Sequence, residues 1–329
     1  MKNSELGQHK NIFAKASAAV VSYRQYTVPL AVLIVAVLGT GAISPRLLRF
    51  DSLMNFLTDA CPLLVLVIGA TLPILLGSID LSLAGMASLA SVLAVRLNPQ
   101  FGSASALVVV LVCASIGALQ GFIQAWVQIP SLVMTLGMLG ILEGASMLLT
   151  NGTPEPLPES DVIMHLVSGT TWGAPNSALV VLGVLAILGG LMRYTRLGRD
   201  VYACGSGELA ASLSGVNTLR VRITAFAISA ACGALGGLML LSITTFSSPN
   251  LAGNFLLLSI VGVLNGGAAV SGGVGGLLSG VIGGLMASWF SVATVVIGIS
   301  AEAQNAVFGI MALVAGALTT DRSKIGIIK

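Results

Sequence analysis

Charged residues and aromatic side chains are scarce in this sequence. Asp, Glu, Lys and Arg make up 8% of its 329 residues and aromatic residues 5%, whereas soluble domains carry about 25% charged residues. A chain with so little charge cannot cover a water-facing surface, so soluble enzymes, coiled coils and disordered tails do not fit this composition. The net charge of +3 is also too small and too scattered for a nucleic-acid-binding surface.

Motifs of nucleotide-hydrolysing and metal-dependent enzymes are missing as well. The sequence has no G-x-x-x-x-G-K-[ST] phosphate loop and no H-E-x-x-H, and its two histidines, His9 and His165, belong to no ligand cluster. Its four cysteines show no C-x-x-C spacing, so we expect packing residues and neither a disulfide framework nor a metal site. We therefore predict that the chain is not an enzyme and binds no cofactor or metal itself.

A G-x-G-x-x-A string at Gly205, Gly207 and Ala210 superficially resembles a dinucleotide-binding turn. That interpretation needs a βαβ unit of roughly 30 residues around the string and an acidic residue about 20 residues further on. Here the next apolar run begins within that distance. The string is therefore a weak match.

The sequence is rich in long apolar runs and in glycine, of which it has 40, and its mean hydropathy is +0.99. A membrane helix takes roughly 20 residues, so ten helices would leave room only for tails and short loops. The runs are long and unbroken, whereas a membrane barrel shows alternating segments of about ten residues. Glycine lets helices pack closely in lipid. The sequence therefore predicts an all-α, polytopic membrane protein.

About ten transmembrane helices are predicted within a permease-like domain at residues 27–320. The apolar runs lie near residues 27–43, 56–77, 81–96, 104–127, 131–150, 177–192, 221–245, 254–270, 275–299 and 302–319. The short third run either crosses the membrane fully or re-enters. The first run is too long for the apolar region of a signal peptide and no cleavage site closes it, so we expect it to be retained.

Basic residues predict the orientation of these helices. Residues 151–176 contain acidic residues but neither Lys nor Arg, which favours a periplasmic loop. Residues 194–220 and their flanks carry the densest group of arginines, which favours a cytoplasmic loop. Ten spans then place the tails at residues 1–26 and 321–329 in the cytoplasm.

Polar residues within the apolar runs are candidates for a solute pathway, because burying them in a membrane is costly. Asp80 is the sharpest case, since it lies in the segment Gly77–Ser82, whose glycine and serines favour a helix break. Asp80 or Ser82 either caps the next helix turn or contacts solute. The candidates for a pathway or structural role are Asp80, Ser82, Thr135 and Asn265.

Residues 265–284 are unusually rich in glycine. Such a segment forms either a hinge between two spans or a closely packed helix face. We expect a turn at Ser271–Gly276 and helix packing at Gly276, Gly280 and Gly284, which recur every four residues.

The segment Gly207–Gly215 predicts a short helix, closed by glycine, within the cytoplasmic loop. Leu209 and Leu213 lie one turn apart and give it a small apolar face. From the spacing alone, such a helix is either an element on the lipid surface or a docking helix for a soluble partner.

Three stretches of sequence carry a resemblance to one family. Gly77–Ser82 is similar to G-G-I-D-L-S, Ile129–Gly137 to I-P-x-x-x-x-T-L-G, and Thr195–Asn217 to T-R-x-G-R, Y-A, A-A and L-S-G-I-N in order. Together, over about residues 55–320, they resemble the permease subunits of bacterial ABC importers for ribose, xylose, galactose and related sugars. Relatives of these permeases import a sugar-like autoinducer.

The resemblance implies the partners and the coupling residues. It implies a second permease subunit, the same or a related one, a periplasmic solute-binding protein, cytoplasmic ATPase subunits that bind ATP and Mg²⁺, and the lipid of the bacterial inner membrane. It also implies that the short cytoplasmic helix couples to the ATPase. The residues implied in coupling are Gly207, Glu208, Leu209, Ala210, Ala211, Leu213 and Gly215.

The function expected from the sequence is ATP-driven, binding-protein-dependent import of a monosaccharide or sugar-like solute. One alternative is an ion-coupled secondary transporter that uses membrane carboxylates such as Asp80, Glu143 or Glu302. Others are an ABC permease for autoinducer 2 or for a branched-chain amino acid. A membrane enzyme would need a polar catalytic cluster, and none is visible.

Overall fold

A computed structural model describes residues 26–157, 167, 169–300, 303–304, 306–311 and 313. Within these residues the chain is mainly helical, and seven helices are long and apolar enough to cross a membrane. They are Tyr26–Ile43, α2 (Phe50–Leu75), α4 (Ser105–Val127), α5 (Ser131–Thr150), α7 (Asn176–Tyr194), α10 (Thr218–Thr244) and α12 (Leu277–Val296). The prediction of a helical, multi-pass membrane protein is confirmed.

Three of the ten predicted spans differ from these seven helices. The third is α3 (Ser82–Phe101), a continuous helix of 20 residues and about 30 Å, which carries Arg96 and Pro99 in its last turns. The eighth contains α11 (Phe255–Asn265), an apolar helix of only 11 residues. Half of the tenth, including Glu302, lies outside the described residues, as do His9, His165 and both predicted tails apart from Tyr26.

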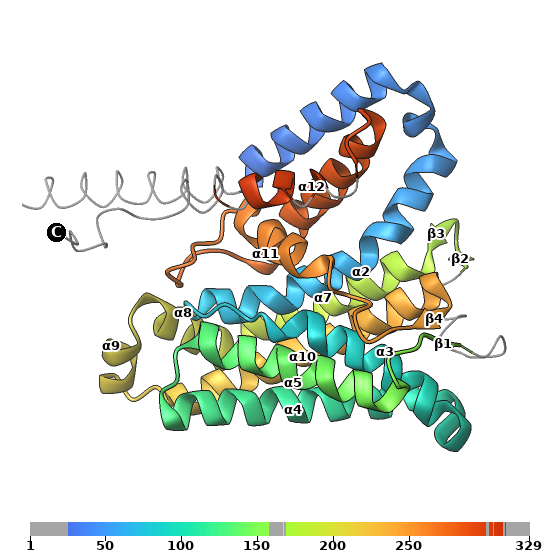
Figure 1. Cartoon of the computed structure of the whole chain (residues 1–329). Coiled ribbons are helices and arrows are strands. Elements are labelled where there is room, and N and C mark those ends of the chain that lie inside the picture. Colours follow the sequence, from blue (N-terminus) through green and yellow to red (C-terminus); the bar gives the residue numbers. More distant parts are fainter. Residues whose placement is uncertain are drawn as a thin grey trace, which may run out of the picture.

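Helices α2 and α10 form the centre of the bundle. Every residue of α2 from Ala60 to Leu75 is buried, and α10 packs against α2, α3 and α4. Figure 1 shows the helix Tyr26–Ile43, α11 and α12 on one side of α2, with α3, α4, α5 and α10 on the other. All four cysteines are buried with free thiols, as expected of packing residues.

The bundle has two distinct ends. At one end lie α8 (Arg196–Ser206) and α9 (Glu208–Leu213); we call this the α9 end. At the other, β1 (Glu155–Pro156) pairs antiparallel with β4 (Phe246–Ser247), and β2 (Thr170–Thr171) with β3 (Ala174–Pro175). The strands β1 to β4, of two residues each, are a small departure from the predicted all-α fold. Two short 3-10 helices are η1 (Pro45–Leu48) and η2 (Gly102–Ala104).

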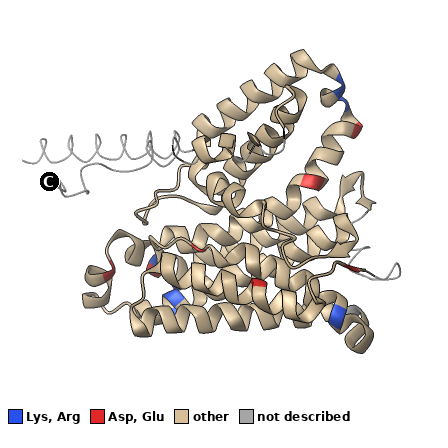
Figure 2. Cartoon of the chain, in the orientation of Figure 1, with Lys and Arg blue, Asp and Glu red and all other residues tan. Residues whose placement is uncertain are grey.

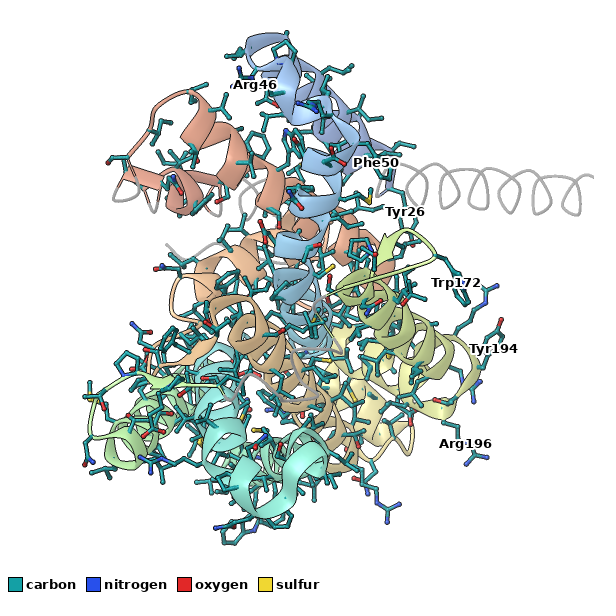
Figure 3. All side chains as sticks on the ribbon, turned by 90° about the vertical axis from the view of Figure 1, so that its right-hand side faces the viewer. Tyr26, Arg46, Phe50, Trp172, Tyr194 and Arg196 are labelled. Carbon is teal, nitrogen blue, oxygen red and sulfur yellow. The ribbon has the colours of Figure 1, made fainter. Side chains whose placement is uncertain are left out.

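Charged side chains are sparse along the long helices, as the mainly tan ribbon in Figure 2 shows. At the β1–β4 end, the Arg96 guanidinium forms an ion pair with Glu155 and donates to the Leu149 carbonyl, which fixes β1 against α3 and α5. In Figure 3, Trp172 between β2 and β3, and Tyr194 and Arg196 at the opposite end of α7 (Asn176–Tyr194), all point outward from the bundle. Exposed aromatic and basic side chains of this kind are typical of membrane interfaces.

Glycines set the closest helix contacts. In α10, a Cβ at Gly237 would collide with the backbone carbonyl of Ala87 in α3. Gly283 of α12 lies directly against Gly262 and Gly266. Because the opposing atoms belong to the backbone, they cannot move aside as a flexible side chain would.

The predicted glycine face of α12 needs one correction. Gly280 and Gly284 do face α2, since a Cβ would lie 2.9 Å from Thr71 Oγ1 and 3.0 Å from Leu64 Cδ2, respectively. Gly276, however, precedes the helix as its N-cap and makes no such close contact. The helix begins one residue later than the four-residue spacing assumed, and Gly283 makes the tighter approach.

We predict that Gly237→Ala lowers the thermal stability of the protein in detergent, because the added methyl group forces α3 and α10 apart. Overpacking of this kind costs about 1–3 kcal/mol. Gly144→Ala is the matched control: Gly144 is an exposed helical glycine in α5 with open space around it. Its replacement should leave the melting temperature unchanged or slightly higher. Equal melting temperatures for both variants would contradict the packing role.

Candidate pathway site and coupling loop

A helix break separates α2 from α3 at residues 76–81. The end of α2 is a Schellman motif: the Gly77 N–H donates to the Ile74 carbonyl and the Ser78 N–H to the Pro73 carbonyl, both at 2.9 Å. Gly77 has a φ of +72°, which only glycine adopts readily. The sequence therefore ends the helix inside the bundle and leaves a short extended segment before Ser82.

Asp80 in this break is 5% exposed and accepts hydrogen bonds from two elements. Its Oδ1 accepts from the Ser82 N–H at 3.0 Å and from the Ser82 hydroxyl, at the start of α3. Its Oδ2 accepts from the Ser229 hydroxyl of α10 at 2.8 Å. Both carboxylate oxygens are therefore occupied within the protein, and of the two roles considered for Asp80 the geometry favours the structural one.

Gln120 of α4 extends this network. Its Oε1 lies 3.0 Å from Ser82 Oγ, while its Nε2 has no hydrogen-bond partner among the residues that the structure describes. The serine has one proton, which Asp80 Oδ1 also attracts. With the amide reversed, Nε2 donates to Ser82 Oγ and the serine proton remains for Asp80. That orientation satisfies more groups, since amide oxygen and nitrogen positions are assigned from the hydrogen-bond network.

Thr135 and Asn265 occupy different surroundings. Thr135 is fully buried near the start of α5, and its hydroxyl donates to the Ile79 carbonyl at 3.1 Å, so it belongs to the break. Asn265 ends α11, and its buried Nδ2 has no partner among the described residues. The structure thus brings Asp80, Ser82 and Thr135 together, and no hydrogen bond joins Asn265 to them.

Sequence reasoning missed three polar residues here: Gln120, Gln124 and Ser229. Gln120 and Gln124 lie one helical turn apart in α4, and both are almost completely buried. The available signal was two glutamines spaced by four within an otherwise apolar run, a spacing that places them on the same helix face.

At the α9 end, the break meets α8 and the glycine-rich turn that precedes α12. The Gly273 N–H donates to the Leu75 carbonyl at 2.9 Å, and Gly205 of α8 packs directly on the same carbonyl. The Tyr202 hydroxyl donates to the Gly275 carbonyl at 2.8 Å. Three segments distant in sequence are therefore in backbone contact, and the predicted turn at Ser271–Gly276 is confirmed.

Burial shapes the chemistry of two α8 side chains that face this junction. Burial raises the pKa of the Tyr202 hydroxyl, and Tyr26 adds to the effect. Burial also raises the pKa of the Cys204 thiol, with Glu208 and Asp200 contributing in the same direction. Both groups therefore stay protonated at neutral pH, so Tyr202 keeps the proton that it donates to Gly275.

The predicted helix at Gly207–Gly215 is present as α9, a helix of six residues. Gly207 precedes it as the N-cap, and Gly215, with a φ of +87°, follows it in a second Schellman motif. Ala211 is buried in the apolar cluster that also contains Leu75, whereas Leu209 and Leu213 are 76% and 82% exposed. The helix thus presents two leucines outward from a buried base.

Glu208 at the start of α9 forms an ion pair with Arg222 of α10, with 2.7 Å between Oε2 and the guanidinium nitrogen. Beside this pair lies a cavity of about 440 Å³ between the break, α4 and α9. Its lining includes Gly77, Ser78, Gln124, Gln128, Glu208 and Arg222. The start of α9 and the break therefore share one polar cavity.

The G-x-G-x-x-A string lies in this loop. Residues 196–206 before Gly207 form helix α8, and Gly205 is used for contact with Leu75. A dinucleotide-binding turn requires a strand at that place. The string is therefore not a dinucleotide-binding turn, which agrees with the weak match in the sequence.

Comparison with known proteins identifies the class of this chain. Residues 52–316 match the family described as the branched-chain amino acid transport system / permease component. The chain belongs to this family and is a permease subunit of an ABC importer. The recognised family and the predicted transport function are thereby confirmed.

Three relatives show which ABC permeases the chain is similar to. The chain is 28% identical to the ribose import permease protein RbsC of Escherichia coli K12, over 86% of this chain and 90% of the relative. It is 33% identical to the probable ABC transporter permease protein YphD of the same strain, over 85% and 86%. It is also 33% identical to the autoinducer 2 import system permease protein LsrC of Yersinia pseudotuberculosis, over 80% and 75%. No solved structure matches the chain.

We predict that Asp80→Asn lowers the thermal stability of the protein, because an amide nitrogen cannot accept from Ser229 or Ser82. Leaving buried donors without an acceptor costs about 1–3 kcal/mol. Asp51→Asn, at the exposed start of α2, is the control for loss of a carboxylate. Thermal unfolding in detergent measures both. A variant at position 80 that melts with the wild type would contradict the structural role of this carboxylate.

Proposed function

We propose that this chain forms half of the membrane pathway of an ATP-driven importer for a monosaccharide or sugar-like solute. The relatives named for ribose and for autoinducer 2 support this solute class, because both compounds are small and rich in oxygen groups. The observation that carries the proposal is the position of α9: its exposed leucines lie outside a buried base, whose Ala211 belongs to the same apolar cluster as Leu75 at the end of α2. A partner that moves α9 thereby acts on the helix break.

In this proposal α9 docks into a cleft of a cytoplasmic ATPase subunit, which binds ATP and Mg²⁺. Leu209 and Leu213 enter that cleft, since apolar side chains one turn apart suit helix-in-groove recognition. Ala211 stays against the permease. Nucleotide-driven closure of the ATPase then shifts the break through α8 and the Leu75 carbonyl, as a partner with different affinity for two states shifts an equilibrium.

The proposed topology places the α9 end in the cytoplasm of a bacterium and the β1–β4 end in the periplasm. The arginines around α8, Arg193, Arg196 and Arg199, support this orientation. Ten spans then bring both tails to the cytoplasm. A second permease subunit, the same or related, completes the pathway in the inner membrane, and a periplasmic binding protein delivers solute at the opposite end.

An ion-coupled secondary transporter remains the alternative class. It would require a membrane carboxylate that exchanges protons or binds a cation. Asp80 accepts hydrogen bonds from Ser82 and Ser229 at both oxygens, which favours a structural role and argues against ion coupling at this position.

Reconstitution tests the proposed function. The chain is assembled in proteoliposomes with its ATPase and permease partners and its binding protein, and uptake of D-ribose, D-xylose, D-galactose and autoinducer 2 is measured. We expect uptake of at least one of these solutes that depends on ATP and on the binding protein. Concentrative uptake by the chain alone, driven by a proton or sodium gradient, would refute the proposal. Uptake of leucine in place of all four would assign it to amino acids.

We predict that Leu209→Asp combined with Leu213→Asp reduces co-purification of the ATPase by about tenfold or more, because the charges oppose burial in an apolar cleft. The folded permease should keep its melting temperature, since both side chains are exposed. The control replaces both leucines by methionine, which conserves volume and apolar character. Full ATPase association of the double aspartate variant would show that α9 does not dock through these leucines.

A further inference from the structure

The cavity at the α9 end has the size and lining of a ligand site. Its volume of about 440 Å³ lies within the range of about 300–1,000 Å³ that is usual for small-molecule pockets. Ser78, Gln124 and Gln128 contribute uncharged polar groups, and the paired charges of Glu208 and Arg222 lie at its edge. An uncharged solute with several hydroxyl groups suits such a lining better than an anion or an apolar molecule.

Gln124 is the second observation that points to a ligand. The residue is 0% exposed, and neither its amide oxygen nor its amide nitrogen has a hydrogen-bond partner in the described part of the chain. A buried amide without partners is costly. If this position served packing alone, leucine or methionine would fill it without that cost. Gln124 is also one of the residues that line the cavity. Its amide carries donors and an acceptor, and a hydroxyl group can satisfy both kinds.

Polar groups continue from this cavity toward the middle of the bundle. Gln120 lies one turn before Gln124 on α4 and reaches Ser82 at the break. On α10, Arg222 and Ser229 are seven residues apart, about 10 Å along the helix axis, and contact Glu208 and Asp80 respectively. The cavity is therefore the α9-end part of a polar strip that α4 and α10 share with the break.

We propose that this cavity is a solute-binding chamber on the inner half of the import route, and that Gln124 hydrogen-bonds the hydroxyl groups of a polyhydroxylated solute there. This inference rests on the proposed function. Glu208 forms part of the chamber and also begins α9, so docking of the ATPase acts directly on the edge of the chamber. A weak, uncharged contact holds solute in transit while still allowing its release to the cytoplasm.

Gln124→Met tests the chamber in the complete reconstituted assembly. The probe is one of D-ribose, D-xylose, D-galactose and autoinducer 2, chosen because the wild-type assembly imports it. We expect uptake to fall about tenfold, the effect of losing a well-made hydrogen bond. Binding-protein-stimulated ATP hydrolysis should stay within about twofold of wild type, and the melting temperature should not fall. Ser105→Ala is the control: it removes another buried hydroxyl, at the opposite end of α4, that has no partner within the described ranges, and it should behave as wild type.

Any other outcome of this experiment contradicts the proposed solute-binding chamber. Unchanged uptake by Gln124→Met shows that the solute does not need the Gln124 amide, which water alone then satisfies in the wild-type protein. Parallel loss of uptake and of stimulated ATP hydrolysis makes Gln124 a coupling residue and overturns the binding role. If the methionine variant fails to assemble, Gln124→Asn keeps an amide one methylene shorter, and uptake equal to wild type then refutes the contact. Failure of the wild-type assembly to import any of the four solutes refutes the proposed function itself.

Discussion

The structure depends on how the buried Asp80 carboxylate is held. A carboxylate removed from water is strongly unfavourable unless hydrogen bonds replace its hydration. Here Ser82 and Ser229 provide them, and in doing so they fix the break between α2 and α3 onto α10. Because α2 and α10 are the two most buried helices among the membrane-length helices described, this single polar cluster sets the register of the bundle's centre. Apolar packing by itself is less directional and would allow the helices to slide.

The same break connects the centre of the bundle to the surface at the α9 end. The Leu75 carbonyl receives the Gly273 N–H, and Gly205 packs on it without an intervening side chain. Contacts of this kind between backbones transmit displacement because no rotamer change can absorb it. The exposed leucines of α9 and the buried carboxylate at position 80 are thereby linked through a few short segments, which is a suitable arrangement for a permease driven from outside the membrane.

Much of this arrangement could be read from the sequence, for identifiable reasons. The α9 helix was predictable because Gly215 ends it and the two leucines recur one turn apart, and the break at Gly77–Ser82 because glycine, serine and aspartate interrupt an apolar run. The hydrogen bond from Ser229 to Asp80 was not predictable, since Ser229 is 149 residues away and many serines were available. The role of Gln124 was missed because burial without a partner is a property of the fold. The count of ten spans included the apolar runs that fold as α3 and α11, and neither belongs to the seven membrane-length apolar helices, because α11 has only 11 residues and α3 carries Arg96 and Pro99.

The burial of all four cysteines has a practical side for spectroscopy. Maleimide and methanethiosulfonate reagents require a thiolate that they can reach, and Cys61, Cys113, Cys204 and Cys232 are each shielded by neighbouring helices. We therefore expect little labelling of the native cysteines when a fluorophore or spin label is attached at a single introduced thiol. Movements of the loop between α7 and α10 can then be followed in real time without first replacing the native cysteines.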